Sequence, residues 1–78
     1  MKLTKQLALE VANTLDLSFV EPGQDLDWND VREIANHHTG GQLDYFQLGM
    51  LTDWAHKLGA ERLRWRRRRR AAGEILVL

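Results

Sequence analysis

Three histidines and a single serine are the side chains of this sequence that could support catalysis or metal binding. His37 and His38 are adjacent, His56 is the third, Ser18 is the only serine, and there is no cysteine. Neighbouring residues on a helix point about 100° apart, so His37 and His38 cannot chelate one ion from a rigid helix. Nothing in the sequence places a base beside Ser18. We therefore expect a non-enzymatic protein with no metal site and no cofactor.

The aspartates of the middle segment do not form a recognisable ion site either. Asp25, Asp27 and Asp30 lack the glycine and the glutamate that a calcium loop requires at fixed positions. Thr39–Gly40–Gly41 precedes a helix but carries no phosphate-loop lysine. Together with Glu33, the three aspartates would instead complement a basic site on a partner, including a site that normally binds nucleic acid.

An arginine tract near the C-terminus is the strongest binding signal. Seven residues between positions 62 and 70 are arginine: Arg62, Arg64, Arg66, Arg67, Arg68, Arg69 and Arg70. Arginine donates paired hydrogen bonds to phosphate or carboxylate and stays charged. Trp65 could stack on a base, so the residues from Arg64 onward predict a nucleic-acid site. The other interpretations are contact with an acidic patch on a protein partner and a solvated helix end.

Charge is divided unevenly along the chain, although the net charge is zero. Residues 1–55 contain three Lys/Arg and nine Asp/Glu, a balance of −6, whereas residues 56–78 contain eight and two, a balance of +6. The acidic part would repel a phosphate backbone that was not held away from it. The division also fits two halves that neutralise each other across a homodimer.

Tyr45 and Phe46 are the candidate anchors for a protein partner. They lie off the main apolar stripe of their helix, and aromatic side chains contribute much of the binding energy at protein interfaces. Leu63 could join them as an exposed aliphatic anchor. The alternative is that these residues form a second buried face against another helix.

Residues 31–48 also follow the spacing of a helix-turn-helix motif, with Thr39–Gly40–Gly41 as the turn. The first turns of the second helix contain no lysine or arginine, and Asp44 and Asp53 would face phosphates. This regulator-like interpretation is one form of the nucleic-acid alternative.

Three helices are expected to position these residues. The repeat of Leu3, Leu7, Val11 and Leu15 predicts a helix over 4–16. Asp27 is the expected N-cap of a second helix that ends at the glycines after Thr39. The third helix is predicted over 42–70. Its apolar stripe is expected to pack on the core and consists of Leu43, Met50, Leu51, Trp54, Leu58 and Trp65.

The predicted fold class is all-α: a small three-helix domain over 1–70 with a long C-terminal helix, followed by an apolar tail over 71–78. Residues 74–78 are short, apolar and β-branched, which is typical of an edge strand. They could pair with 17–20 as a two-stranded ribbon, dock elsewhere, or remain disordered.

The length and composition limit how the chain can be stabilised. A chain of 78 residues forms one domain with a small core, and without cysteine it has no disulfides. A homodimer would be a common remedy and stays open. The sequence contains no apolar run of membrane-spanning length and no signal-peptide pattern, so we expect a cytoplasmic protein without membrane contact.

These features predict a protein-binding module that acts by stoichiometric occlusion of a partner, with DNA or RNA binding as the alternative. In length, lack of cysteine and arginine content, the chain resembles the small inhibitors that phages and mobile elements use to block a host protein. The resemblance implies action in the host cytoplasm. The expected contact residues are Tyr45, Phe46 and the seven arginines of the tract.

Overall fold

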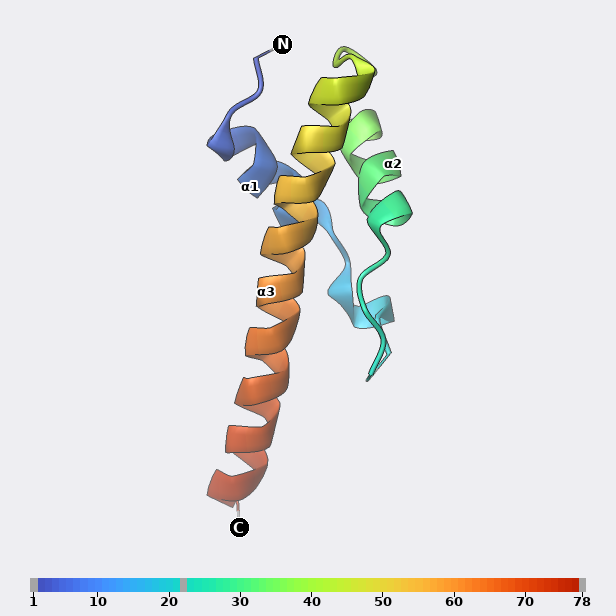
Figure 1. Cartoon of the computed structure of the whole chain (residues 1–78). Coiled ribbons are helices and arrows are strands. Elements are labelled where there is room, and N and C mark those ends of the chain that lie inside the picture. The colour runs from blue at the N-terminus through green and yellow to red at the C-terminus, as the bar shows by residue number, and fades with distance from the viewer. Residues whose placement is uncertain (1, 22, 78) are drawn as a thin grey trace.

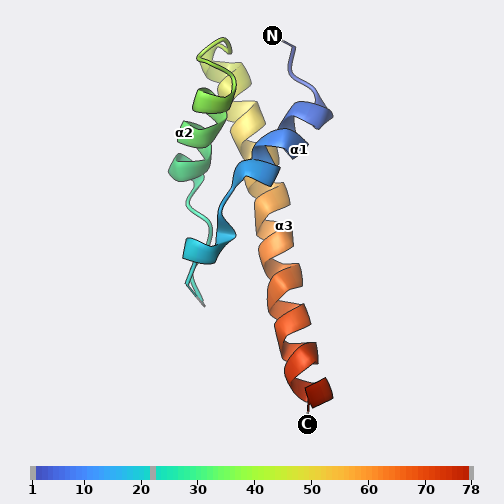
Figure 2. The ribbon, with the colours of Figure 1, turned by 180° about the vertical axis from the view of Figure 1, so that it is seen from behind.

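The longest helix organises the fold. The computed structural model describes residues 2–21 and 23–77, except for the side chains of residue 19 and residues 66–77. Helices α1 (Lys5–Thr14) and α2 (Trp28–His38) both lie on one side of helix α3 (Tyr45–Val77), as Figure 1 and Figure 2 show from opposite directions. The predicted all-α, three-helix class is confirmed, and the described part of the chain contains no strand.

Local hydrogen bonds set the ends of α1. The Thr4 hydroxyl accepts a hydrogen bond from the Leu7 backbone N–H at 3.1 Å, as an N-cap residue does. The helix buries Leu7, Ala8, Val11 and Ala12 and ends where Leu15 adopts an extended backbone. The predicted helix over 4–16 is therefore confirmed, with slightly shorter bounds.

The two-stranded ribbon that the sequence left open is not formed in the described part of the chain. Leu17–Phe19 forms a single 3-10 turn, capped by the Asp16 carboxylate, which accepts a hydrogen bond from the Ser18 backbone N–H at 3.0 Å. This aspartate satisfies the backbone locally, which leaves a turn instead of an extended strand. The proposed partner segment over 74–77 continues α3, and Leu78 lies outside the described residues.

Helix α2 begins and ends where its capping residues predict. The Asp27 carboxylate accepts a hydrogen bond from the Asn29 backbone N–H at 2.8 Å. After Thr39, Gly40 and Gly41 have φ values of 63° and 71°, in the left-handed region that favours glycine. This turn reverses the chain, so α2 and α3 run side by side in opposite directions (Figure 1).

Helix α3 begins at Tyr45, three residues later than predicted, because Asp44 caps it. The Asp44 carboxylate accepts a hydrogen bond from the Gln47 backbone N–H at 2.8 Å, and the Gln47 side-chain oxygen lies 3.5 Å from the Asp44 backbone nitrogen. This reciprocal pair is a capping box built from aspartate and glutamine. The helix continues to Val77, beyond the predicted end at Arg70.

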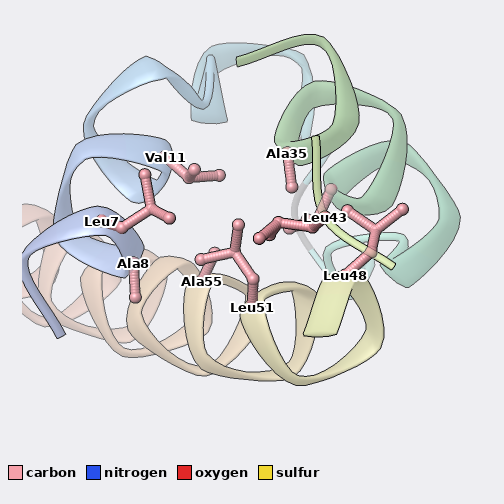
Figure 3. Close-up of a cluster of buried hydrophobic side chains, with 9 residues drawn as sticks. Leu7, Ala8, Val11, Ala35, Leu43, Leu48, Leu51 and Ala55 are labelled. Carbon is pink, nitrogen blue, oxygen red and sulfur yellow. The ribbon is translucent and has the colours of Figure 1, made fainter. Parts of the chain in front are cut away.

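The core lies in the wedge between α3 and the other two helices (Figure 3). Its central residues, Val11 from α1, Val31 from α2 and Leu51 from α3, are fully buried. The cluster comprises Leu7, Ala8, Val11, Val31, Ala35, Leu43, Leu48, Leu51 and Ala55. Burial of aliphatic side chains from all three helices is the main force that holds them together.

The predicted inward stripe of α3 is only partly correct. Leu43 and Leu51 are buried and Leu58 packs against the core, but Met50, Trp54 and Trp65 are exposed. The buried arc is instead rotated towards a set of smaller residues, namely Leu48, Leu51, Thr52, Ala55, Gly59 and Leu63. Small side chains at Ala55 and Gly59 let neighbouring segments approach the helix more closely than a tryptophan would.

The connection between α1 and α2 packs on Gly59. A Cβ added at Gly59 would lie 2.7 Å from Leu26 Cδ2 and 2.9 Å from Leu15 Cδ1. The His56 imidazole holds the same connection, because its Nε2 lies 2.7 Å from the Leu26 carbonyl oxygen and must donate to it. The segment that lies closest to α3 at Gly59 is therefore the connection between α1 and α2.

Candidate binding surface

Tyr45 and Phe46 form an exposed aromatic pair at the start of α3. Their side chains are 75% and 80% exposed. The ring centroids lie 5.8 Å apart with an interplanar angle of 86°, an edge-to-face arrangement. Both residues therefore lie on the surface, as expected for anchors, whereas Leu63 is buried and is not part of this surface.

Neighbouring elements hold this aromatic pair in place. The Arg32 guanidinium of α2 lies 5.5 Å from the centre of the Tyr45 ring, within the range of a cation–π contact. Asp44 caps the first turn directly before the pair. The pair thus lies on a rigid helix end and not on a loop.

The exposed apolar surface continues along the outer face of α3. Met50 and Trp54 follow Phe46 at intervals of four residues and are 53% and 44% exposed, and Trp65 further along is 65% exposed. Sequence periodicity predicts all three residues in the core, and that prediction is wrong. The signal for the correct face is the parallel series of smaller residues from Leu48 to Leu63, which satisfies the same helical spacing.

The predicted arginine contacts lie far from the aromatic pair. Arg64 is exposed and Arg62 is half-buried, while the side chains of Arg66, Arg67, Arg68, Arg69 and Arg70 lie outside the described residues. At 1.5 Å per residue, Phe46 and Arg64 are separated by about 27 Å along the helix axis. The structure therefore does not bring the predicted partner-binding residues together in one cluster.

Trp28 links α2 to α3 at the edge of this surface. Its indole Nε1 donates a hydrogen bond of 2.7 Å to the Asp53 carboxylate, and its ring is partly exposed. This contact joins the first turn of α2 to α3. Trp28 lies one turn before the buried Val31, but its polar partner on α3 holds it at the rim of the core.

An acidic groove of about 720 Å³ lies beside α2. Its aliphatic lining includes Leu26 and Ile34, and its carboxylates are Asp16, Asp25, Asp27, Asp30 and Glu33. Asp16 and Asp27 cap helical turns. The groove brings together the three aspartates and the glutamate that the sequence suggested as a complement to a basic partner.

Two of the three histidines, His38 and His56, contact other parts of the chain. His56 binds the Leu26 carbonyl, and His38 lies 3.5 Å from the Glu10 carboxylate. Histidine and acidic residues do not form a metal-binding cluster anywhere in the described part of the chain.

The segment of the helix-turn-helix interpretation forms an antiparallel hairpin. Helices α2 and α3 lie side by side and antiparallel, joined by the glycine turn (Figure 2). The first three turns of α3 carry Asp44 as their cap and Asp53 as their charged residue, with no basic side chain. The start of α3 therefore presents aromatic and acidic side chains, and the regulator-like interpretation stays a prediction.

Comparison of the chain with protein-family models, with curated proteins and with solved structures gives no match. Within the described residues, no helix combines the length and the apolar character needed to cross a membrane.

Proposed function

We propose that this protein is a non-enzymatic binding module that attaches to a protein partner through Tyr45 and Phe46 and acts by stoichiometric occlusion of the partner's surface. The observation that carries the proposal is the exposure of both rings on a capped helix end. The core is complete without them, so their burial in a complex would remove large apolar areas from water.

The arrangement of the pair supports this use. The edge-to-face contact and the Arg32 guanidinium restrict the Tyr45 ring before any partner arrives. Such preorganisation lowers the conformational entropy that is lost on binding. Aromatic residues on a rigid element, next to one arginine, match the composition of binding hot spots.

Nucleic-acid binding through the arginine tract is the second candidate. It is favoured by one observation, the exposure of Trp65 beside the exposed Arg64, which leaves an indole face available for stacking on a base. The site would comprise Arg64, Trp65 and the five arginines that follow. Its binding would fall steeply with salt, because counterions are released when phosphates are neutralised.

The two candidates can be separated with two variants of the full chain. The first replaces Tyr45 and Phe46 with alanine, and the second replaces the five arginines of positions 66–70 with glutamine. Each variant is immobilised beside the unmodified chain and incubated with an extract of the source cell, and the retained proteins and nucleic acids are identified. Retained proteins are then purified and titrated calorimetrically.

Under the proposal, the alanine variant loses at least about 30-fold in affinity for the partner, the effect of removing a hot spot. Its thermal melting curve should match that of the parent because both side chains are exposed. The glutamine variant should keep stoichiometric binding. If the glutamine variant alone loses binding, and the lost material is nucleic acid released by salt, the second candidate is correct and the first is wrong.

A further inference from the structure

Six exposed residues share the outer face of α3 over its middle part: Asp53, Trp54, Lys57, Glu61, Arg64 and Trp65. At 100° per residue they fall within an arc of about 120°, on the side opposite the buried Ala55 and Gly59. All six side chains are exposed, and α2 reaches this face only at its edge, where Trp28 donates a hydrogen bond to Asp53.

The charges of these six residues complement those of the same helix placed in the opposite direction. An acid and a tryptophan stand at one end, in Asp53 and Trp54, and a base and a tryptophan stand at the other, in Arg64 and Trp65. Between them, Lys57 is followed by Glu61. Reversal of the helix direction about position 59 therefore brings every acid to within one residue of the level of a base, and each tryptophan to within one residue of the level of the other.

We infer that this face of α3 binds a second copy of the chain, with the two α3 helices antiparallel and related by a two-fold axis near position 59. Lys57 of each copy then lies beside Glu61 of the other, Asp53 beside Arg64, and Trp54 beside Trp65. The members of each pair differ in level by no more than about one residue, a rise of about 1.5 Å. Each contact occurs twice, as an isologous interface requires.

Charge selects the antiparallel orientation. In a parallel pair, the basic C-terminal parts of the two chains, each with a balance of +6 over residues 56–78, would lie side by side and repel. In the antiparallel pair they lie at opposite ends. Among the side chains that the structure describes, Lys57, Glu61 and Arg64 have no ion-pair partner, and Asp53 uses one carboxylate oxygen for Trp28.

The paired tryptophans give this face its apolar component. Trp54 and Trp65 are exposed in the single chain, and stacking of two indoles from each copy would bury large areas in the contact. A chain of 78 residues has a small core, which makes such burial valuable for stability. The inference does not depend on Tyr45 and Phe46 and goes beyond the proposed function.

A charge-swap series on the full chain tests the inference. The mass in solution is measured by light scattering and sedimentation over a range of concentrations for the parent, for Lys57→Glu, for Glu61→Lys, and for an equimolar mixture of the two variants. Lys2→Glu makes the same charge change at an exposed position off this face and is the matched control. Circular dichroism establishes that each variant is folded.

The parent and Lys2→Glu are expected to be dimers. Each swap alone creates two like-charge contacts and should raise the dimer dissociation constant at least about ten-fold. The mixture should recover the parent's affinity as a heterodimer, because the glutamate introduced in one variant faces the lysine introduced in the other only in the antiparallel register. Trp54→Ala should weaken the dimer about 30-fold.

Three results would overturn the inference. The first is a parent chain that is a monomer at every concentration. If the Trp54→Ala variant then also fails to bind another protein that the parent binds, the face belongs to that protein. If neither charge swap changes the dimer dissociation constant, the dimer interface lies elsewhere on the molecule. Swaps that weaken the dimer without recovery in the mixture would exclude this register.

Discussion

Gly59 shows how one missing side chain positions a whole connection. The methyl groups of Leu15 and Leu26 occupy the space that a Cβ would need, so the chain between α1 and α2 can lie directly on α3. Gly49, on the same helix, has nothing within 4 Å of its virtual Cβ. The packing therefore requires a glycine at position 59 but leaves room for a side chain at position 49.

Replacement of each glycine by alanine should change stability in opposite directions. Gly49→Ala should stabilise the protein by about 1 kcal/mol, the difference in helix propensity. Gly59→Ala has the same gain but must displace two packed leucine methyl groups, and overpacking costs about 1–3 kcal/mol, so we expect a net loss of about 1 kcal/mol. Urea unfolding followed by circular dichroism measures both. Equal stabilisation by the two substitutions would show that the connection does not pack on Gly59.

The orientation of α3 about its own axis decides which of its side chains are buried and which are exposed. Its inner arc carries Leu51 and Ala55, which contact α1 and α2, and its outer arc carries Met50 and Trp54. A rotation of α3 about its axis by one residue, about 100°, would bury Met50 and Trp54 in place of Leu51 and Ala55. The exposed surface proposed for binding exists only because the smaller residues face inward.

Two adjacent substitutions test this orientation. Leu51→Ala should destabilise the protein by about 2–5 kcal/mol, because it leaves a cavity at a fully buried position. Met50→Ala removes a side chain that is 53% exposed and should change stability by less than about 0.5 kcal/mol. Thermal and urea unfolding provide the comparison. A greater loss for Met50→Ala would mean that the predicted stripe, and not the observed one, packs on the core.

The whole molecule consists of a packed body and a helical extension. Among the side chains that the structure describes, every buried one lies at or before Leu63, although α3 continues to Val77. The extension contains the five consecutive arginines, so the basic charge lies at one end of the long axis and the acidic groove lies beside α2. Stability and basic charge are thus carried by different parts of one chain.

A chain that ends after Trp65 should therefore fold as the parent does. We expect its unfolding free energy per folded unit to differ by less than about 0.5 kcal/mol, because no described core contact is removed. Circular dichroism and urea unfolding at equal concentration measure this. If the shortened chain is unfolded, residues 66–78 contribute to the core, and the division between body and extension is wrong.

Short-range chemistry in the sequence determined the three helices and most of their ends. Thr4 and Asp27 cap the first turns of their helices through hydrogen bonds to residues two or three positions away, and Gly40 and Gly41 supply the left-handed turn. Asp44 moved the start of α3 by three residues, again through a local contact. For Tyr45 and Phe46 the sequence left exposure and burial against another helix open, and the structure exposes both residues.

Only the tertiary structure decided which arc of α3 faces inward. The sequence offers two overlapping stripes of similar helical spacing, one rich in tryptophan and one of smaller aliphatic residues, and periodicity cannot rank them. Two helices and a connection must all reach the same side of α3, and Ala55 and Gly59 permit an approach that Trp54 would block. Close packing therefore selected the smaller stripe and left the tryptophans and their alternating charges on the surface.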